Sequence, residues 1–79
     1  MARYTVRKGK RYRAQVSLSL FQQIVSNAEI ARRFTAAGFA EVIVSGRGRQ
    51  RVATGLWPSE DATAEIPPQV KEIVELEVA

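Results

Sequence analysis

The chain has neither cysteine nor histidine among its 79 residues. It can therefore form no disulfide, and it lacks the thiolate, the imidazole and the usual zinc ligands on which much enzyme chemistry depends. No apolar run approaches the roughly 18 residues that span a bilayer, and the start has no signal-peptide pattern. We therefore expect a cytoplasmic, non-enzymatic chain that carries no metal, no cofactor and no membrane span.

Size and charge set the remaining bounds. Hydrophobic residues make up 46% of the chain and charged residues 25%. This predicts one small domain over 1–79, because so short a chain buries only about 60% of its unfolded surface. The net charge of +4 is unevenly distributed: residues 1–13 hold six bases and no acid, and residues 59–79 hold six acids and one base. We interpret 1–10 as a basic N-terminal arm or the start of a strand.

Residues 12–20 alternate strictly between apolar and polar side chains. A period of two is typical of a strand with one buried face and one face in water. The side chains expected to point inward are Tyr12, Ala14, Val16, Leu18 and Leu20. This is the clearest strand signal in the chain.

A helix is expected over 27–37, because both of its ends are marked. Ser26-Asn27-Ala28-Glu29 matches a capping box, in which the serine hydroxyl and the glutamate carboxylate satisfy each other's backbone N–H groups. Gly38 supplies the left-handed residue that ends the helix, and Phe39 is placed to contact Phe34 as in a Schellman motif. The expected buried stripe comprises Ile30, Ala31, Phe34 and Ala37.

The second half of the chain predicts a hairpin, a short helix and a last strand. Strands are expected over 41–45 and 49–57, joined by a turn at 46–48 whose glycines allow positive φ. One or two helical turns are expected within 59–70, where Pro67-Pro68 prevents a longer helix. The strand 72–78 should point Val74, Leu76 and Val78 inward and Glu75 and Glu77 outward.

The element order is therefore β-α-β-β-(short α)-β. It predicts an α+β fold of the split βαβ, ferredoxin-like kind, with a four-stranded antiparallel or mixed sheet and its helices on one face. The first and last strands of this sheet would be antiparallel neighbours. Arg11 and Arg13 would then lie opposite Glu75 and Glu77 on the open face, where each pair contributes roughly 0.2–1 kcal/mol.

Catalytic and phosphate-binding interpretations have simpler alternatives. Glu75 and Glu77 are best explained as solvated partners of arginines. The run Gly46-Arg47-Gly48-Arg49 is best explained as a hairpin turn, because it lacks the lysine and helix start of a P-loop. Trp57, before Pro58 at a strand end, is either a plug at the core edge or, if exposed, a sugar-stacking group.

A nucleic-acid interface is a separate hypothesis. Basic side chains in the arm and on the hairpin can line phosphates; they are Lys8, Lys10, Arg47, Arg49 and Arg51. The aromatic residues that would stack on bases do not fall on the expected open face.

Several sequence motifs together resemble those of a known protein family. They are Tyr12-Arg13-Ala14-Gln15-Val16, Ser19-Leu20-Phe21, Asn27-Ala28-Glu29, Phe34, Gly38-Phe39 and Arg51-Val52-Ala53-Thr54-Gly55-Leu56-Trp57-Pro58. Over residues 12–58 the chain resembles a SPOR (sporulation-related repeat) domain. The resemblance implies a βαββαβ fold whose open sheet face binds peptidoglycan glycan strands that lack stem peptides. It also implies that Gln15 contacts sugar, with Arg13, Arg51 and Trp57 beside it.

The leading hypothesis is a non-enzymatic binding or assembly module that uses its open sheet face, with glycan as the favoured ligand class. One alternative is a single-stranded nucleic-acid-binding domain. Another is a small phage- or operon-encoded structural protein, either a monomer or a homodimer that pairs through an exposed sheet edge.

Overall fold

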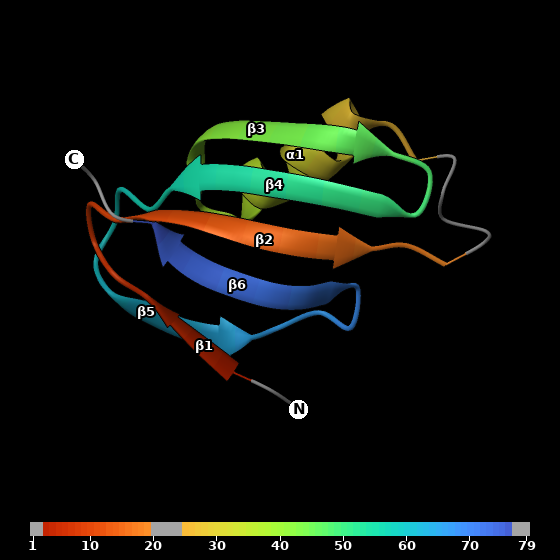
Figure 1. The fold of residues 1–79 in the computed structure, drawn as a ribbon. Helices are drawn as coiled ribbons and strands as arrows, with labels where there is room; N and C mark the ends of the chain where they lie inside the picture. The colour runs from red at the N-terminus through yellow and green to blue at the C-terminus, as the bar shows by residue number, and fades with distance from the viewer. Residues whose placement is uncertain (1–2, 20–24, 77–79) are drawn as a thin grey trace.

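The computed structural model describes residues 3–19 and 25–76. Within these ranges the fold is α+β, with one helix and six strands in two antiparallel sheets. The elements are β1 (Arg3–Val6), β2 (Arg11–Ser17), α1 (Asn27–Ala37), β3 (Ala40–Arg47), β4 (Gln50–Leu56), β5 (Ala62–Glu65) and β6 (Val70–Leu76). The larger sheet has the order β3-β4-β2-β6, and β1 pairs with β5 in a separate ribbon. Figure 1 shows α1 behind the larger sheet and the ribbon below β6.

Strand β2 confirms the predicted alternation. Tyr12, Ala14 and Val16 are buried, whereas Arg13 and Gln15 are exposed. Leu18 continues the buried series and packs with Val16 and Ile30 in one cluster. Leu20, the last residue expected to point inward, lies outside the described residues.

Helix α1 has the predicted bounds, and its caps explain them. The Ser26 hydroxyl accepts a hydrogen bond from the Glu29 N–H at 3.1 Å. At the other end Gly38 has a φ of 119°, and the Phe39 N–H donates to the Phe34 carbonyl at 3.2 Å. The Phe34 and Phe39 rings meet with their centroids 6.0 Å apart, which completes the Schellman motif. Ala37, expected in the buried stripe, is exposed.

The hairpin is confirmed, but its turn lies further along the chain than predicted. Strand β3 includes Gly46 and Arg47, and Gly48-Arg49 form the turn. Gly46 has a φ of 98° and Gly48 a φ of 69°. Near its start β3 contains an irregularity in register, where Glu41 has a φ of 52°.

The short helix predicted within 59–70 is wrong, because this stretch contains strand β5 and no helix. Strand β5 is antiparallel to β1, with Val6 opposite Ala62 and the Thr5 and Thr63 hydroxyl oxygens 2.7 Å apart. A helix start at 59–62 is a weak local signal, and two prolines follow it closely. The backbone groups of β1 satisfy those of β5 instead.

The predicted orientation of the last strand is also wrong. Val74 lies opposite Arg13 and Leu76 opposite Arg11, so both are on the open face, whereas Glu75 lies opposite the buried Tyr12. Ile73 and Val74 are adjacent apolar residues whose side chains point to opposite faces, so the strand buries one of them whichever face is turned inward. The sequence pattern therefore does not determine which face is buried. Glu77, the other predicted partner of these arginines, lies outside the described residues.

Candidate functional site: the open sheet face

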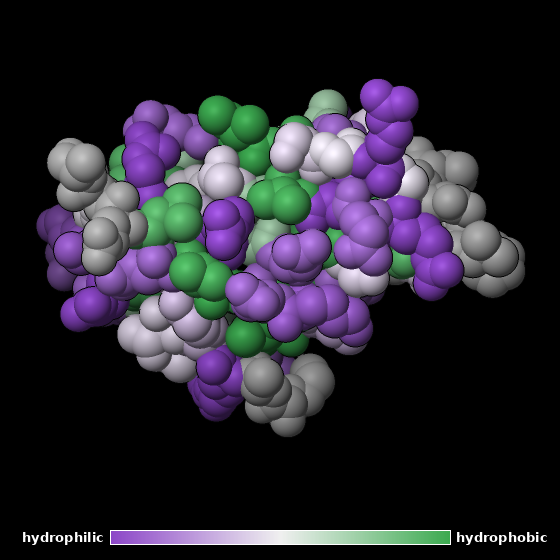
Figure 2. All heavy atoms as spheres, in the orientation of Figure 1, coloured by the Kyte–Doolittle hydropathy of each residue, from purple (hydrophilic) through white to green (hydrophobic). Residues whose placement is uncertain are grey.

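The open face is the side of the four-stranded sheet opposite α1. The side chains that the pairing registers place on it include Arg11, Arg13, Gln15, Ser17, Ile43, Ser45, Arg47, Gln50, Val52, Thr54, Leu56, Glu72, Val74 and Leu76. Figure 2 looks onto this face and shows apolar and polar side chains interspersed across it. Polar side chains lie along the middle of β2 and toward the end of it that is nearest the β3–β4 turn. Aliphatic side chains gather near the start of β2. The face therefore offers hydrogen-bonding groups beside aliphatic surface.

Arg13 and Gln15 lie two residues apart at the centre of the open face. Arg13 is flanked by Val74 and Thr54, and Gln15 has Val52 as its neighbour on β4. Both side chains are exposed, and within 3–19 and 25–76 no hydrogen bond or ion pair engages either of them. The guanidinium has five N–H donors, and the amide both donates and accepts. Arg13 and Gln15, both predicted site residues, therefore lie on the same face and point into solvent.

Arg51 does not share this face, so the expectation that it lies beside Gln15 is wrong. It lies opposite Val16 and is only 5% exposed. Its guanidinium donates to the Val25 carbonyl and to Asn27 Oδ1, both at 2.8 Å, and its Nε donates to the Gly48 carbonyl at 3.1 Å. Arg51 thus joins the hairpin turn to the start of α1.

Trp57 is placed on the helix side of the sheet, beyond the end of β4. Its ring packs on Phe39 with the centroids 5.1 Å apart, and its Nε1 donates to the Glu60 carbonyl at 2.8 Å. An added Cβ at Gly38 would lie 2.9 Å from the indole ring, so that glycine makes room for it. The indole is therefore a plug at the core edge, away from Arg13 and Gln15.

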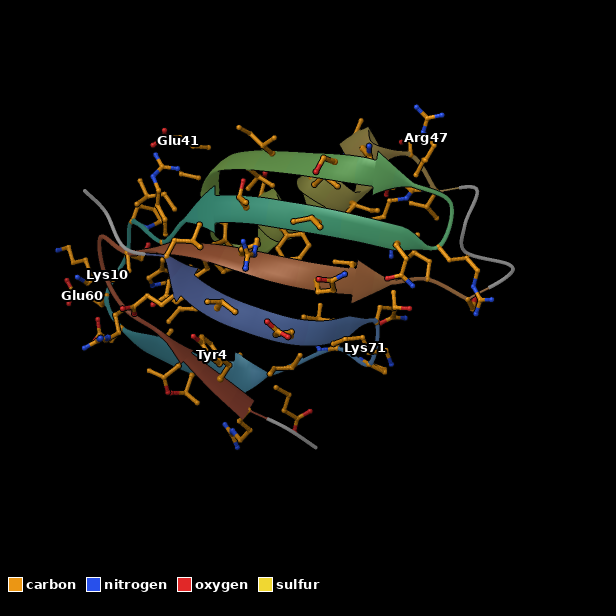
Figure 3. All side chains as sticks on the ribbon, viewed as in Figure 1. Tyr4, Lys10, Glu41, Arg47, Glu60 and Lys71 are labelled. Atoms are coloured by element: carbon orange, nitrogen blue, oxygen red, sulfur yellow. The ribbon has the colours of Figure 1, made fainter. Side chains whose placement is uncertain are left out.

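The basic residues of the nucleic-acid hypothesis fall into two groups. Figure 3 shows Lys10 and Arg47 at opposite ends of the sheet. Lys8 forms an ion pair with Glu60 at 3.1 Å, and Arg49 donates to the Leu18 carbonyl at 3.1 Å. These side chains therefore do not form one continuous basic surface.

The aromatic side chains of the described ranges pack on one another between the layers. Tyr12 contacts both Tyr4 and Phe39 edge to face, with centroids 5.9 Å and 6.4 Å away. Phe39 in turn contacts Phe34 and Trp57. Among the described residues the open face carries no aromatic ring, so it has no stacking platform for bases or sugars.

Sequence reasoning missed a polar cluster on the helix side of the sheet. The buried Tyr12 hydroxyl accepts from the Arg7 N–H at 2.6 Å and donates to Glu75 Oε1 at 3.1 Å. The Arg7 guanidinium also reaches the Glu75 carboxylate at 3.3 Å. Its hydrogen bond holds the pKa of Glu75 below the ordinary value, and burial raises the pKa of Tyr12. The alternation at 12–20 places Tyr12 inside, but no sequence signal pairs it with two residues so distant in the chain.

The lowered pKa of Glu75 predicts a specific loss of stability in acid. The carboxylate is favoured in the folded state, so its contribution is complete above the ordinary pKa of about 4.5 and disappears as pH falls through the lower folded value. Glu75→Gln should therefore flatten the decline in unfolding free energy below about pH 4.5. Urea unfolding at a series of pH values measures this slope. Glu72→Gln, on the open face, is the matched control and should retain the wild-type slope; equal flattening by both would contradict the assignment.

An apolar cavity lies behind the sheet, between α1 and the β1–β5 ribbon. Its volume is about 440 Å³, and its walls include Val16, Ile30, Phe34, Val6 and Ile73. Arg33 and Glu65 are the charged side chains that line it. As far as the structure describes them, at 3–19 and 25–76, the walls are mainly apolar and carry no convergent set of polar groups that would orient a substrate.

Comparison with protein-family models, curated proteins and solved structures found no match to this chain. In the ranges 3–19 and 25–76, no helix is long and apolar enough to cross a membrane. The same ranges contain no group of three or more carboxylates that could hold a metal ion. The geometry of the open face is therefore the basis for a functional proposal.

Proposed function

We propose that this chain is a non-enzymatic binding module whose ligand lies on the open face, over Arg13 and Gln15. The observation that carries the proposal is that both side chains are exposed on one face of β2 and are not engaged by other described residues. Strand β2 is paired on both sides, with β4 and β6. An inner strand holds its side chains in fixed relative positions, which favours recognition by hydrogen bonds.

The favoured ligand class is a glycan strand. Sugar hydroxyls both donate and accept hydrogen bonds, as the Gln15 amide does, and Arg13 adds further donors. Aliphatic Val52 and Val74 lie next to these polar groups and suit the apolar faces of sugar rings. The resemblance of residues 12–58 to SPOR domains also supports this choice, because it implies that Gln15 contacts sugar.

The split βαβ, ferredoxin-like plan is part of the same proposal. It is supported by the order β3-β4-β2-β6, in which β2 and β6 are antiparallel neighbours and β4 lies between β2 and β3. The β1–β5 ribbon would stand where the second helix of that plan packs. Such a plan leaves the face opposite α1 uncovered and available to a ligand.

The proposal predicts that Gln15→Ala weakens binding to glycan strands about tenfold, the effect of losing one or two hydrogen bonds of about 1 kcal/mol. Co-sedimentation with cell-wall sacculi stripped of stem peptides by an amidase measures the affinity. Gln50→Ala is the matched control, because Gln50 lies on the same face but bonds Ser17 at 3.4 Å. It should bind like the wild type. Failure of the wild-type protein to co-sediment would refute the glycan ligand.

A further inference from the structure

Strand β3 forms an outer edge of the four-stranded sheet. Within the described ranges it pairs with β4 alone. The Gly46 carbonyl accepts a hydrogen bond from Asn27 Nδ2 at 3.1 Å, so it points away from β4. Because successive residues of a regular antiparallel strand alternate in the direction of their backbone groups, Val44 also points its N–H and C=O outward. The pairing becomes irregular between Ala40 and Ile43, so the regular outer edge centres on Val44, whose outward donor and acceptor have no partner strand among the described residues.

The side chains in the middle of β3 do not protect this edge. Protein edge strands usually carry a charge or a proline that discourages pairing with another chain. The segment 42–45 is Val-Ile-Val-Ser and has neither. Ile43 is 67% exposed and is the exposed large hydrophobic side chain of the described residues. The chemistry of this edge thus favours a partner strand.

The charges at the two ends of β3 complement each other. In an antiparallel pairing of two β3 strands centred on Val44, Glu41 lies opposite Arg47 of the partner subunit. The two-fold symmetry repeats this contact at the other end. In the same register Ile43 lies beside Ser45 of the partner subunit, on the open face. Glu41 contacts Arg11 through Oε1 at 2.8 Å, which leaves its second oxygen for the arginine of the other copy.

We propose that two copies of this chain pair through β3 in this register and join their sheets into one sheet of eight strands. The occupant of the edge is a second copy because the edge is complementary to itself in charge. The positive φ of Glu41 marks the point where the flat part of the edge ends. The dimer is independent of any ligand on the open face, and the two proposals can fail separately.

Charge reversal and mixing test the register. Sedimentation equilibrium of the full chain over a concentration series should show a monomer–dimer equilibrium. Glu41→Arg or Arg47→Glu alone places like charges opposite each other at both ends of the pairing, and each should raise the dimer dissociation constant about tenfold. An equimolar mixture of the two variants should recover near wild-type association, because the mixed dimer has opposite charges at both ends.

Lys71→Glu is the matched control for charge. It makes the same change in net charge as Arg47→Glu, but on β6, at the other outer strand of the sheet, and should leave the dissociation constant unchanged. Circular dichroism checks that each variant is folded. A wild-type protein that stays monomeric at its highest soluble concentration would overturn the proposal. The proposal would also be overturned if neither charge reversal raised the dimer dissociation constant, or if Lys71→Glu raised it as much as they do.

Discussion

Arg51→Ala is expected to lower the free energy of unfolding by about 3 kcal/mol, one of the two largest effects predicted for this chain. The side chain is nearly fully buried, and its hydrogen bonds within the described residues include those to Val25, Asn27 and Gly48. Removing it takes the donor from part-buried acceptors, where each lost hydrogen bond to a charged group contributes roughly 1–3 kcal/mol, and opens a cavity. Urea unfolding followed by circular dichroism measures the loss.

Two comparisons make this prediction specific. Arg47→Ala removes an exposed arginine from the same hairpin and, at protein concentrations where the chain is monomeric, should change the unfolding free energy by less than about 0.5 kcal/mol. Asn27→Ala combined with Arg51→Ala should destabilise the fold by less than the sum of the single changes, because the two side chains share a hydrogen bond. If Arg51→Ala were as mild as Arg47→Ala, the arginine would not join the hairpin to the helix.

The elements whose signals are local could be predicted from sequence. The bounds of α1 follow from Ser26 and Gly38, whose roles depend only on neighbouring residues. The orientation of β2 follows from its unbroken alternation. Arg13 and Gln15 could be placed on the open face for the same reason, since they are the polar members of that alternation.

The remaining errors come from contacts between distant parts of the chain. Strand β5 forms because β1 pairs with it, and no sequence pattern within 59–70 indicates that β1 is its partner. Hydrophobicity alone would place Val52 and Leu56 of β4 in the core. They lie on the open face instead, because the space behind the sheet is closely packed. There, Gly55 faces Phe39, and an added Cβ would lie 3.3 Å from the phenylalanine Cβ. Arg51 lies four residues before Gly55 and therefore on the same side of β4, so its side chain is buried behind the sheet.

Gly46→Ala is expected to destabilise the fold by roughly 3 kcal/mol or more, for two additive reasons. The φ of 98° at Gly46 is unfavourable for a residue with a side chain, at a cost of about 1–2 kcal/mol. The new Cβ would also lie 2.5 Å from the Gln50 carbonyl oxygen and 3.2 Å from the Arg51 Cα. Both are backbone atoms of the paired strand, so relief requires the hairpin itself to shift.

Gly48→Ala separates these two contributions. Gly48 also has a positive φ, 69°, but an added Cβ there meets nothing within 4 Å. Its substitution should cost only about 1 kcal/mol, the conformational part alone. Urea midpoints of the two variants, measured under the same conditions, give the difference directly. Because the clash at Gly46 is with the backbone of β4, equal losses in the two variants would mean that β3 and β4 do not pair with Gly46 opposite Arg51.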